Sequence, residues 1–211
     1  MTAQNLMTTM VSNNHLDAAL EWLNSRRKHC LDRISLSQNF PAFKQDLRRT
    51  LLAGEYQFSP LEIIPISTGY IGRWGSQDAL VIKALTRMLQ RLLAKRWKKN
   101  CFHVSGQGGL KAALREVKSK LPEYTYCFKT DIESFYRTMD HHYLLSRFAH
   151  FVKDKRVMRL IDQCLNRVEV YQAEHKLVTQ GVCKGCSLSP LLGALYLLEC
   201  DEQMKDKNLV Y

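Results

Sequence analysis

Apolar residues recur along much of this chain at the three- and four-residue spacing of helices with one buried face. This pattern, together with helix start and stop signals, predicts helices over 16–28, 41–54, 76–98, 109–120, 141–151, 154–166 and 187–205. Asp140 stands before one of these segments as an N-cap, and Pro190 fits the first turn of the last one. These segments form the helical part of the predicted fold.

Extended segments separate these helices. Residues 56–66 contain two prolines that exclude a helix, and residues 67–76 contain three glycines that predict a hairpin turn or loop. Residues 124–130 have the pattern of a strand that leads directly into two carboxylates. Residues 167–181 alternate between apolar and polar positions and predict a hairpin.

The composition narrows the class of protein. The chain has 211 residues, 45% of them apolar, which is enough for one sizeable core or for one large and one small domain. Its net charge of +11 favours polyanionic partners, with nucleic acid ahead of an anionic membrane surface. No apolar run reaches the about 18 residues of a membrane span, and the N-terminus has no signal-peptide pattern. A cytoplasmic protein without a membrane partner is expected.

Seven cysteines are scattered along the chain, as expected for free thiols in a reducing compartment. Cys183 and Cys186 form the one CxxC pair, and no second pair lies near them in the sequence. Ordinary packing is favoured over zinc binding or redox chemistry for this pair.

A basic stripe follows the helix predicted over 76–98. Its members recur every four residues and lie on a different face from the apolar residues: Lys83, Arg87, Arg91 and Lys95. Two interpretations stay open, a solvated surface and a face that follows a nucleic-acid backbone. The run 95-KRWKKN-100 favours the second modestly, because Trp97 among cations could stack on a base.

Asp131 and Glu133 follow the predicted strand 124–130. Residues two apart in an extended chain point to the same side, so the pair could offer oxygen ligands to a cation such as Mg²⁺. A solvated strand end or a helix N-cap would produce the same short pattern, and for an isolated pair that interpretation is favoured.

The residues around Asp131 resemble the first palm motif of reverse transcriptases, especially those of the group II intron and retron-like kind. The matching run is 130-TDIESFYRTMDHHYLL-145, with Asp131, Ile132, Phe135, Tyr136, Met139, Asp140, His141, Leu144 and Leu145 at the places of the motif. A second run, 181-GVCKGCSLSPLLGALYLLECD-201, is similar to the next motif, with Gly185, Ser189 and Pro190 at its fixed points. A looser match to the fingers covers 62–85 through Pro65, Arg73 and Asp78. The resemblance runs from about residue 45 to the end.

The resemblance implies an α+β fold, with the fingers and a partial palm of a right-hand polymerase and no thumb. The palm would be an antiparallel sheet with helices packed on one face. The implied organisation is an N-terminal helical extension over 1–44, a fingers-like region over 45–122 and a partial palm-like region over 123–211.

The resemblance also implies the chemistry of an RNA-directed DNA polymerase. Such an enzyme uses an RNA template, a DNA primer and deoxynucleoside triphosphates, and two Mg²⁺ ions assist in-line phosphoryl transfer. Asp131 would be the catalytic metal ligand, with the Ile132 carbonyl as a backbone ligand, while Glu133 occupies a variable position and is left out.

The same resemblance assigns nucleotide-binding roles. Tyr136 would lie under the incoming sugar and exclude a 2′-hydroxyl, and Phe135 would belong to the core. Arg73 would hold the triphosphate, and Gly185 would let backbone approach the nascent base pair. Lys184 stands where the family commonly has Gln; it can donate a hydrogen bond to the nucleotide but cannot accept one.

The third palm motif of the family, Tyr-x-Asp-Asp, is absent from the 211 residues. A protein of these residues alone is therefore expected to be inactive, either as a fragment or as a chain that a second polypeptide completes. Two alternatives stay open: a non-catalytic nucleic-acid-binding remnant of a reverse transcriptase, which could bind an RNA–DNA hybrid, and a basic protein that docks on an acidic protein surface.

Overall fold

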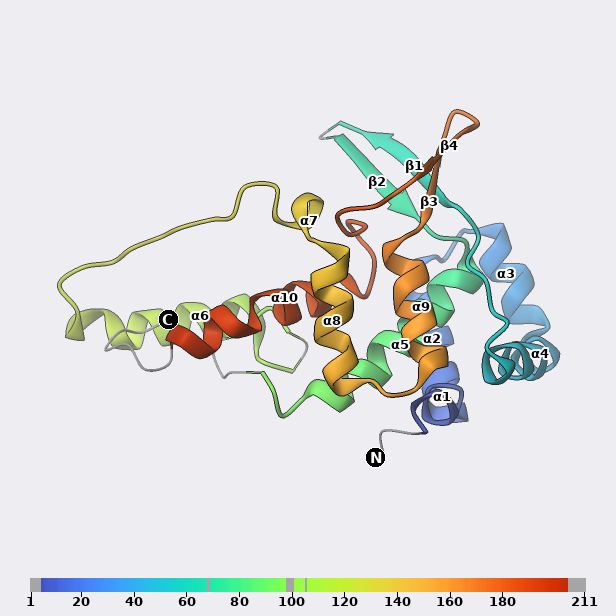
Figure 1. Ribbon diagram of the computed structural model, residues 1–211, viewed down its shortest axis with the longest axis horizontal. Coiled ribbons are helices and arrows are strands. Elements are labelled where there is room, and N and C mark those ends of the chain that lie inside the picture. Colours follow the sequence, from blue (N-terminus) through green and yellow to red (C-terminus); the bar gives the residue numbers. More distant parts are fainter. Residues whose placement is uncertain (1–4, 68, 98–100, 105, 205–211) are drawn as a thin grey trace.

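The protein, here in a computed structural model that describes residues 5–67, 69–97, 101–104 and 106–204, has the expected α+β fold. A cluster of helices lies beneath a small sheet, and α6 (Gly109–Lys120), α10 (Ser189–Met204) and a long loop extend to one side of this body (Figure 1). Among the described residues, no helix is both long and apolar enough to cross a membrane.

Four helices form the N-terminal part: α1 (Leu6–Met10), α2 (Asn13–Arg26), α3 (Leu31–Gln38) and α4 (Phe40–Ala53). The patterns over 16–28 and 41–54 predicted α2 and α4, whereas α1 and α3 were not predicted. Both missed helices are short, at five and eight residues, so a periodic pattern has little room to show in them.

The sheet contains two hairpins. Strands β1 (Leu61–Ile66) and β2 (Gly69–Arg73) pair antiparallel, as do β3 (Val168–Tyr171) and β4 (Glu174–Leu177). A short parallel pairing of β1 with β3 joins them in the order β2-β1-β3-β4. The described sheet is thus mixed rather than wholly antiparallel, because its two central strands come from different hairpins.

The longest helix among the described residues, α5 (Ser76–Leu93), runs through the middle of the core, and α2 packs along it. The other helices are α6 (Gly109–Lys120), the 3-10 turn η1 (Leu121–Glu123), α7 (Phe135–Thr138), α8 (His141–Phe151), α9 (Lys155–Leu165) and α10 (Ser189–Met204). One buried hydrophobic cluster extends from α1 to α10. This cluster crosses both boundaries between the three regions expected from the sequence, 44/45 and 122/123. The division into those regions stays a prediction.

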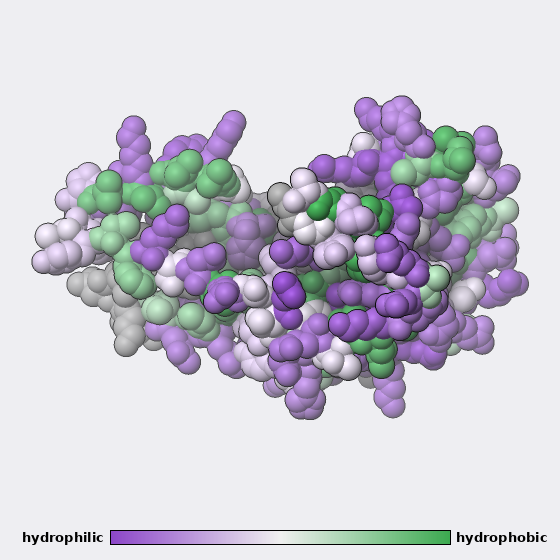
Figure 2. Space-filling model, turned by 90° about the horizontal axis from the view of Figure 1, so that it is seen from above, coloured by the Kyte–Doolittle hydropathy of each residue, from purple (hydrophilic) through white to green (hydrophobic). Residues whose placement is uncertain are grey.

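The strand expected over 124–130 is wrong for this structure. The segment is extended but belongs to no sheet, and it runs as a long exposed connection from η1 to α7 (Figure 1). Tyr126 is 92% exposed and Phe128 is 88% exposed. A strand is defined by backbone pairing, and the four described strands pair elsewhere. Hydrophobic side chains gather on this end of the molecule, over α6 and the extended segment (Figure 2).

Candidate functional site

Backbone hydrogen bonds bring the two best-matched motifs together. The amide of Val182 donates to the carbonyl of Tyr136 over 2.7 Å, and the amide of Gly181 donates to the carbonyl of Met139 over 2.8 Å. The buried His141 ring reinforces this contact, because its Nε2 lies 2.7 Å from the carbonyl oxygen of Gly181. Residues about 45 positions apart in the sequence therefore share one short ladder.

Glycine is needed where these segments meet. Gly181 has a φ of +82°, and a Cβ there would lie 2.5 Å from the carbonyl oxygen of Arg137. Since the obstructing atom belongs to the backbone, it cannot rotate away as a side chain could. The close approach of the two motifs thus depends on this residue.

Tyr136 and Phe135 both pack on α10. A Cβ at Gly193 would lie 3.4 Å from the Tyr136 hydroxyl and 3.3 Å from Phe135 Cε1, so both rings use the space above this small residue. Phe135 also contacts Tyr196 edge-on, with ring centroids 6.0 Å apart. Tyr136 is half-buried, and burial raises its pKa, which favours a neutral ring with an intact hydroxyl.

The hairpin β1–β2 lies over the turn that contains Lys184 and Gly185. Gly185 has a φ of +83°, and a Cβ there would lie 3.2 Å from Ile71 Cδ1. A Cβ at Gly72 would lie 2.7 Å from the Cys183 sulfur. Both glycines therefore allow the turn and the hairpin to touch, while Lys184 and Gly185 stay exposed to solvent.

Arg73, at the end of β2, forms an ion pair with Glu62 in this structure. Its Nε and Nη2 both donate to the Glu62 carboxylate, over 2.9 and 2.6 Å. The hydrogen bond to Glu62 raises the pKa of the arginine, which stays charged. Both side chains are more than half exposed, so the pair is accessible to a competing anion.

Asp131 lies at the exposed end of the extended segment, next to the exposed Ile132 and Glu133. No group of three or more His, Cys, Asp or Glu side chains that could hold a metal occurs within 5–67, 69–97, 101–104 and 106–204. Mg²⁺ prefers about six oxygen ligands, including more than one carboxylate or phosphate. The donors present here fit part of such a site and do not complete it.

The basic stripe faces α2 over part of its length. Lys83 and Arg87 are half-buried, and the Lys83 ammonium lies 5.0 Å from the centre of the Trp22 ring. Arg91 Nη1 lies 3.0 Å from Nε2 of the buried His15. Lys95 is exposed. The four cations therefore do not form one free surface, because α2 covers part of it.

Trp97 was expected to be able to stack on a base. It is only 9% exposed, so it is not available for stacking, and residues 98–100 of the basic run lie outside the described residues.

The CxxC pair was expected to have a packing role. Burial raises the pKa of the Cys183 thiol to about 12. This protonated state agrees with packing rather than redox chemistry for the CxxC pair.

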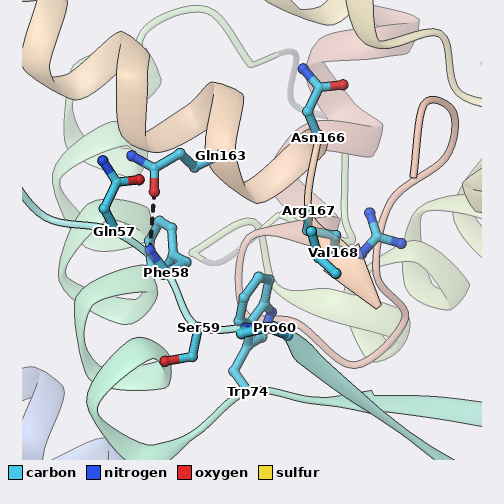
Figure 3. Close-up of a pocket in the computed structure, with 9 residues that line it drawn as sticks. All are labelled: Gln57, Phe58, Ser59, Pro60, Trp74, Gln163, Asn166, Arg167 and Val168. Carbon is cyan, nitrogen blue, oxygen red and sulfur yellow. Dashed lines mark hydrogen bonds between the residues drawn. The ribbon is translucent and has the colours of Figure 1, made fainter. Parts of the chain in front are cut away.

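A separate small cavity of about 200 Å³ lies between α9 and residues 57–60 (Figure 3). The amide of Gln163 spans this junction, since its Oε1 accepts from Phe58 N over 3.0 Å and its Nε2 donates to Tyr56 O over 3.1 Å. These bonds hold the segment before β1 against α9, which is a structural role.

Sequence patterns identified the local segments of the site but missed some of its members. Trp22, Arg26 and Arg27 were not singled out, because their neighbourhood with α5 depends on helix packing. Glu62 was also missed, because its place opposite Arg73 depends on the register of the β1–β2 hairpin.

Comparison with known proteins agrees with the motifs. A sequence model of the family described as reverse transcriptase (RNA-dependent DNA polymerase) matches residues 77–211. Protein YkfC of Escherichia coli (strain K12) is 26% identical over 180 residues, which cover 78% of this chain and 46% of YkfC. An uncharacterized 91 kDa protein in the cob intron of Schizosaccharomyces pombe (strain 972 / ATCC 24843) is 24% identical over 164 residues, which cover 73% of this chain and 20% of that protein.

Solved structures support the fold. A chain of the partial Cas6-RT-Cas1--Cas2 complex superposes with a TM-score of 0.63 and 18% identity, over 95% of this chain and 35% of that one. A chain of the Cas6-RT-Cas1--Cas2 complex gives the same TM-score and identity, over 95% of this chain and 22% of that one. The chain spans less than half the length of the two curated relatives above. Because the family model covers more than half of the chain, this protein belongs to the reverse transcriptase (RNA-dependent DNA polymerase) family.

Proposed function

We propose that this chain forms the fingers and the first part of the palm of an RNA-directed DNA polymerase and supplies one side of its nucleotidyl-transfer site. The observation that carries the proposal is the ladder between Tyr136–Met139 and Gly181–Val182, with the hairpin that carries Arg73 packed over the adjoining turn. It supports the proposal because the segment Tyr136–Met139, the segment Gly181–Val182 and the hairpin that carries Arg73 lie next to one another.

The residues around this ladder have complementary roles in the proposal. The half-buried ring of Tyr136, held on Gly193, lies under the incoming sugar and excludes a 2′-hydroxyl. Arg73 leaves Glu62 to hold the triphosphate through charge-assisted hydrogen bonds. Lys184 adds a donor for the nucleotide, and Gly185 leaves room for the nascent base pair.

Reverse transcriptases generally use divalent metal ions, and Mg²⁺ supplies charge stabilisation at the phosphate oxygens when it is bound. We propose that the Asp131 carboxylate and the Ile132 carbonyl contribute to this binding. One carboxylate is too few for two ions, so further carboxylates are proposed to come from a polypeptide segment outside these 211 residues.

The exposed segment 124–132 supports this proposal. Tyr126 and Phe128 are exposed on an extended chain whose backbone pairs with no described strand. A completing segment could add a strand here and bury both rings. Amide hydrogen exchange over 124–132 should then slow strongly when the completing polypeptide is added, and unchanged fast exchange would count against the added strand.

Primer extension by the completed polymerase tests the site. Asp131→Asn should abolish extension and leave template binding nearly intact, because the carboxylate is exposed and supports no described packing. Glu133→Gln is the matched control, since it neutralises an exposed carboxylate two residues away and should keep extension near the wild-type rate. Substantial extension by Asp131→Asn, or equal loss in both variants, would contradict the metal assignment.

A second candidate function is nucleic-acid binding without catalysis. It is favoured by the net charge of +11 and by the incomplete metal site of the described residues. The protein should then bind an RNA–DNA hybrid with an affinity that falls steeply with salt, because phosphate contacts release counterions. Binding that stays without extension after the completing polypeptide is supplied would favour this function over the first.

A further inference from the structure

Segment 123–129, with the sequence 123-EYTYCFK-129, is exposed over its whole length. It begins at Glu123, the last residue of η1, and continues as the extended connection toward α7, which pairs with no described strand. Three aromatic residues alternate with other side chains, and an acid and a base stand at the two ends. A strand here would place the three rings on one face, because residues two apart share a face. An unpaired extended backbone of this kind is a template for a second strand.

The segment borders an apolar hollow that the described residues leave open. This hollow of about 590 Å³ lies between the segment, the end of α6 with η1, and the end of α10, and its apolar lining includes Val117, Leu121, Phe128 and Met204. Hydrophobic side chains gather over this end of the molecule (Figure 2). An exposed apolar patch rimmed by polar residues marks a surface that a partner covers.

Helix α6 narrows the choice of where a second copy would bind. Its exposed apolar residues have the spacing of a helix-pairing stripe: Leu110, Leu114, Val117 and Leu121. Lys111, Lys118 and Lys120 flank this stripe. Two such helices side by side would bring like charges together, which disfavours their pairing. Segment 123–129 carries both signs of charge and has no such conflict.

An antiparallel pair of two such segments, centred on Tyr126, brings complementary side chains together. Glu123 of one copy then lies opposite Lys129 of the second copy, and Tyr124 lies opposite Phe128 of the second copy. Cross-strand pairs of opposite charge and of aromatic rings both stabilise an antiparallel ladder. The segment is therefore complementary to itself in this register.

Other alignments lose this complementarity. An antiparallel pair centred on Cys127 places Glu123 opposite Asp131 of the second copy. A parallel pair in register places Glu123 opposite Glu123 and Lys129 opposite Lys129. Like charges directly opposite one another destabilise a strand pair, so the sequence selects the antiparallel register centred on Tyr126.

The charges at both ends of the segment are accessible in the single copy. Lys129 is exposed and forms no ion pair with another described residue. The side chain of Glu123 is 59% exposed, and its carboxylate lies 3.7 Å from the Lys120 ammonium. An exposed ion pair is weak, so Glu123 can turn to a second copy at small cost.

We propose that two copies of this chain associate through segment 123–129, which forms an antiparallel strand pair about a two-fold axis at Tyr126 and covers the apolar hollow of each copy. Each copy uses the same residues, so the association is closed at a dimer. Helix α6 beneath each strand supplies the packing that an isolated two-stranded ribbon lacks. The completing polypeptide proposed above needs the same segment, so the dimer concerns the chain without it and does not depend on the polymerase function.

The dimer should be weak. Seven residues a side form a small interface, which predicts a dissociation constant on the order of tens of micromolar. Each copy also carries a net charge of +11, which opposes association. At 0.15 M salt the Debye length is about 8 Å, so this repulsion is largely screened while charges in contact still interact.

Sedimentation equilibrium of the full chain at this salt concentration, from about 1 to about 200 µM, tests the dimer. Lys129→Glu and Glu123→Lys should each weaken it about tenfold or more, because each variant replaces two attractive pairs by two repulsive ones. Lys129→Glu lowers the net charge by two and Glu123→Lys raises it by two, so a general charge effect would act on them in opposite directions. Glu123→Lys/Lys129→Glu restores both pairs and should restore the dimer.

Two further samples sharpen this test. An equal mixture of the two single variants should dimerise about as well as wild type, since both cross-strand pairs are then attractive, and this also shows that each variant is folded. Lys118→Glu on α6 makes the same change of charge outside the segment, and less than about a twofold effect is expected from it.

A wild-type chain that stays monomeric over the whole range would overturn the proposal and leave the segment to the completing polypeptide. Equal weakening by the single variants and by Glu123→Lys/Lys129→Glu would overturn the register. Wild-type assemblies larger than a dimer would overturn the closed two-fold arrangement.

Amide hydrogen exchange locates the association on the chain. Exchange over residues 124–129 should be fast at about 1 µM and clearly slower at about 200 µM in the wild type, because the strand pair forms only at the higher concentration. It should stay fast at both concentrations in Lys129→Glu. Dimerisation without slower exchange in this segment would place the interface elsewhere and overturn the proposal.

Discussion

Asp154 connects α1 to the centre of the fold, and its removal should lower the free energy of unfolding by more than the loss of a helix cap does. Its carboxylate accepts from the backbone amide of Arg156 over 3.1 Å as the N-cap of α9, and from the buried amide of Met7 over 3.0 Å. It also binds the Arg156 guanidinium through both oxygens, over 3.0 and 2.9 Å. Asp154→Ala removes all these bonds at once.

The expected loss can be worked out bond by bond. The missing cap should cost about 1 kcal/mol. The buried Met7 amide is left without its acceptor, which should cost about 1–3 kcal/mol. The ion pair adds less than about 1 kcal/mol, because Arg156 is partly exposed and keeps its bond to the Leu52 carbonyl. We therefore expect Asp154→Ala to destabilise the protein by about 3 kcal/mol.

Asp140 supplies a matched control. It caps α8 through the amide of Tyr143, as Asp154 caps α9, but it is exposed, and within the described residues its carboxylate binds no buried amide of a distant helix. Asp140→Ala should therefore cost about 1 kcal/mol in urea unfolding followed by far-ultraviolet circular dichroism. Equal losses in the two variants would refute the argument that the Met7 amide is held by Asp154.

The pH dependence gives the same reasoning a second test. Burial acts to raise the pKa of Asp154, but the hydrogen bonds from Arg156 and Met7 outweigh it, and the pKa is lowered overall. The stability that the Asp154 carboxylate adds is therefore fully present at pH values above the ordinary pKa of an aspartate. It is lost as the pH falls through the lowered pKa of Asp154 in the folded protein. The difference between wild type and Asp154→Ala should shrink in that acidic range, and a constant difference down to the lowest accessible pH would count against it.

Three further predictions concern the site. Gly181→Ala should cost about 3 kcal/mol in urea unfolding, since its φ is positive and its Cβ would meet a backbone carbonyl. Gly75→Ala should cost less than about 1 kcal/mol, because a Cβ there would make only an ordinary contact of 4.0 Å with Asp78 Oδ2. In the completed polymerase, Glu62→Gln should release Arg73 and lower the KM for deoxynucleotides about two- to fivefold, and an unchanged KM would contradict the role of Arg73. Tyr136→Ala should reduce discrimination against ribonucleotides about tenfold or more in primer extension, and an unchanged ratio would remove its role at the sugar.

The helices were predictable because each pattern is local. Segments such as 141–151 and 154–166 place apolar residues on one face, and the structure has helices His141–Phe151 and Lys155–Leu165 there. The α+β class was instead implied by the resemblance of two sequence motifs to those of reverse transcriptases. The pairing of β1 with β3 was not, because it joins residues more than 100 positions apart through two register pairs.

The candidate site was predictable to a different extent. Local motifs predicted Asp131, Tyr136 and Gly185 as site residues, which stays a prediction, but no local pattern shows that Ile71 packs on Gly185. The basic stripe shows the same limit, because the four-residue spacing predicts a common face and does not reveal that α2 lies along it. Contacts between distant elements decided which of its cations stay accessible.

The structure also separates the two sides of the proposed site by how firmly each is held. Tyr136 and Gly181 are positioned by the ladder, by Gly193 and by the buried His141, all of which belong to the described fold. Asp131 instead follows an exposed segment without a described strand partner. Nucleotide selectivity should therefore be built into this chain, whereas metal affinity should depend on whatever orders the segment before Asp131. Mg²⁺ titrations should accordingly show tight binding only after the completing polypeptide is added, and tight binding by this chain alone would mean that Asp131 is already in place.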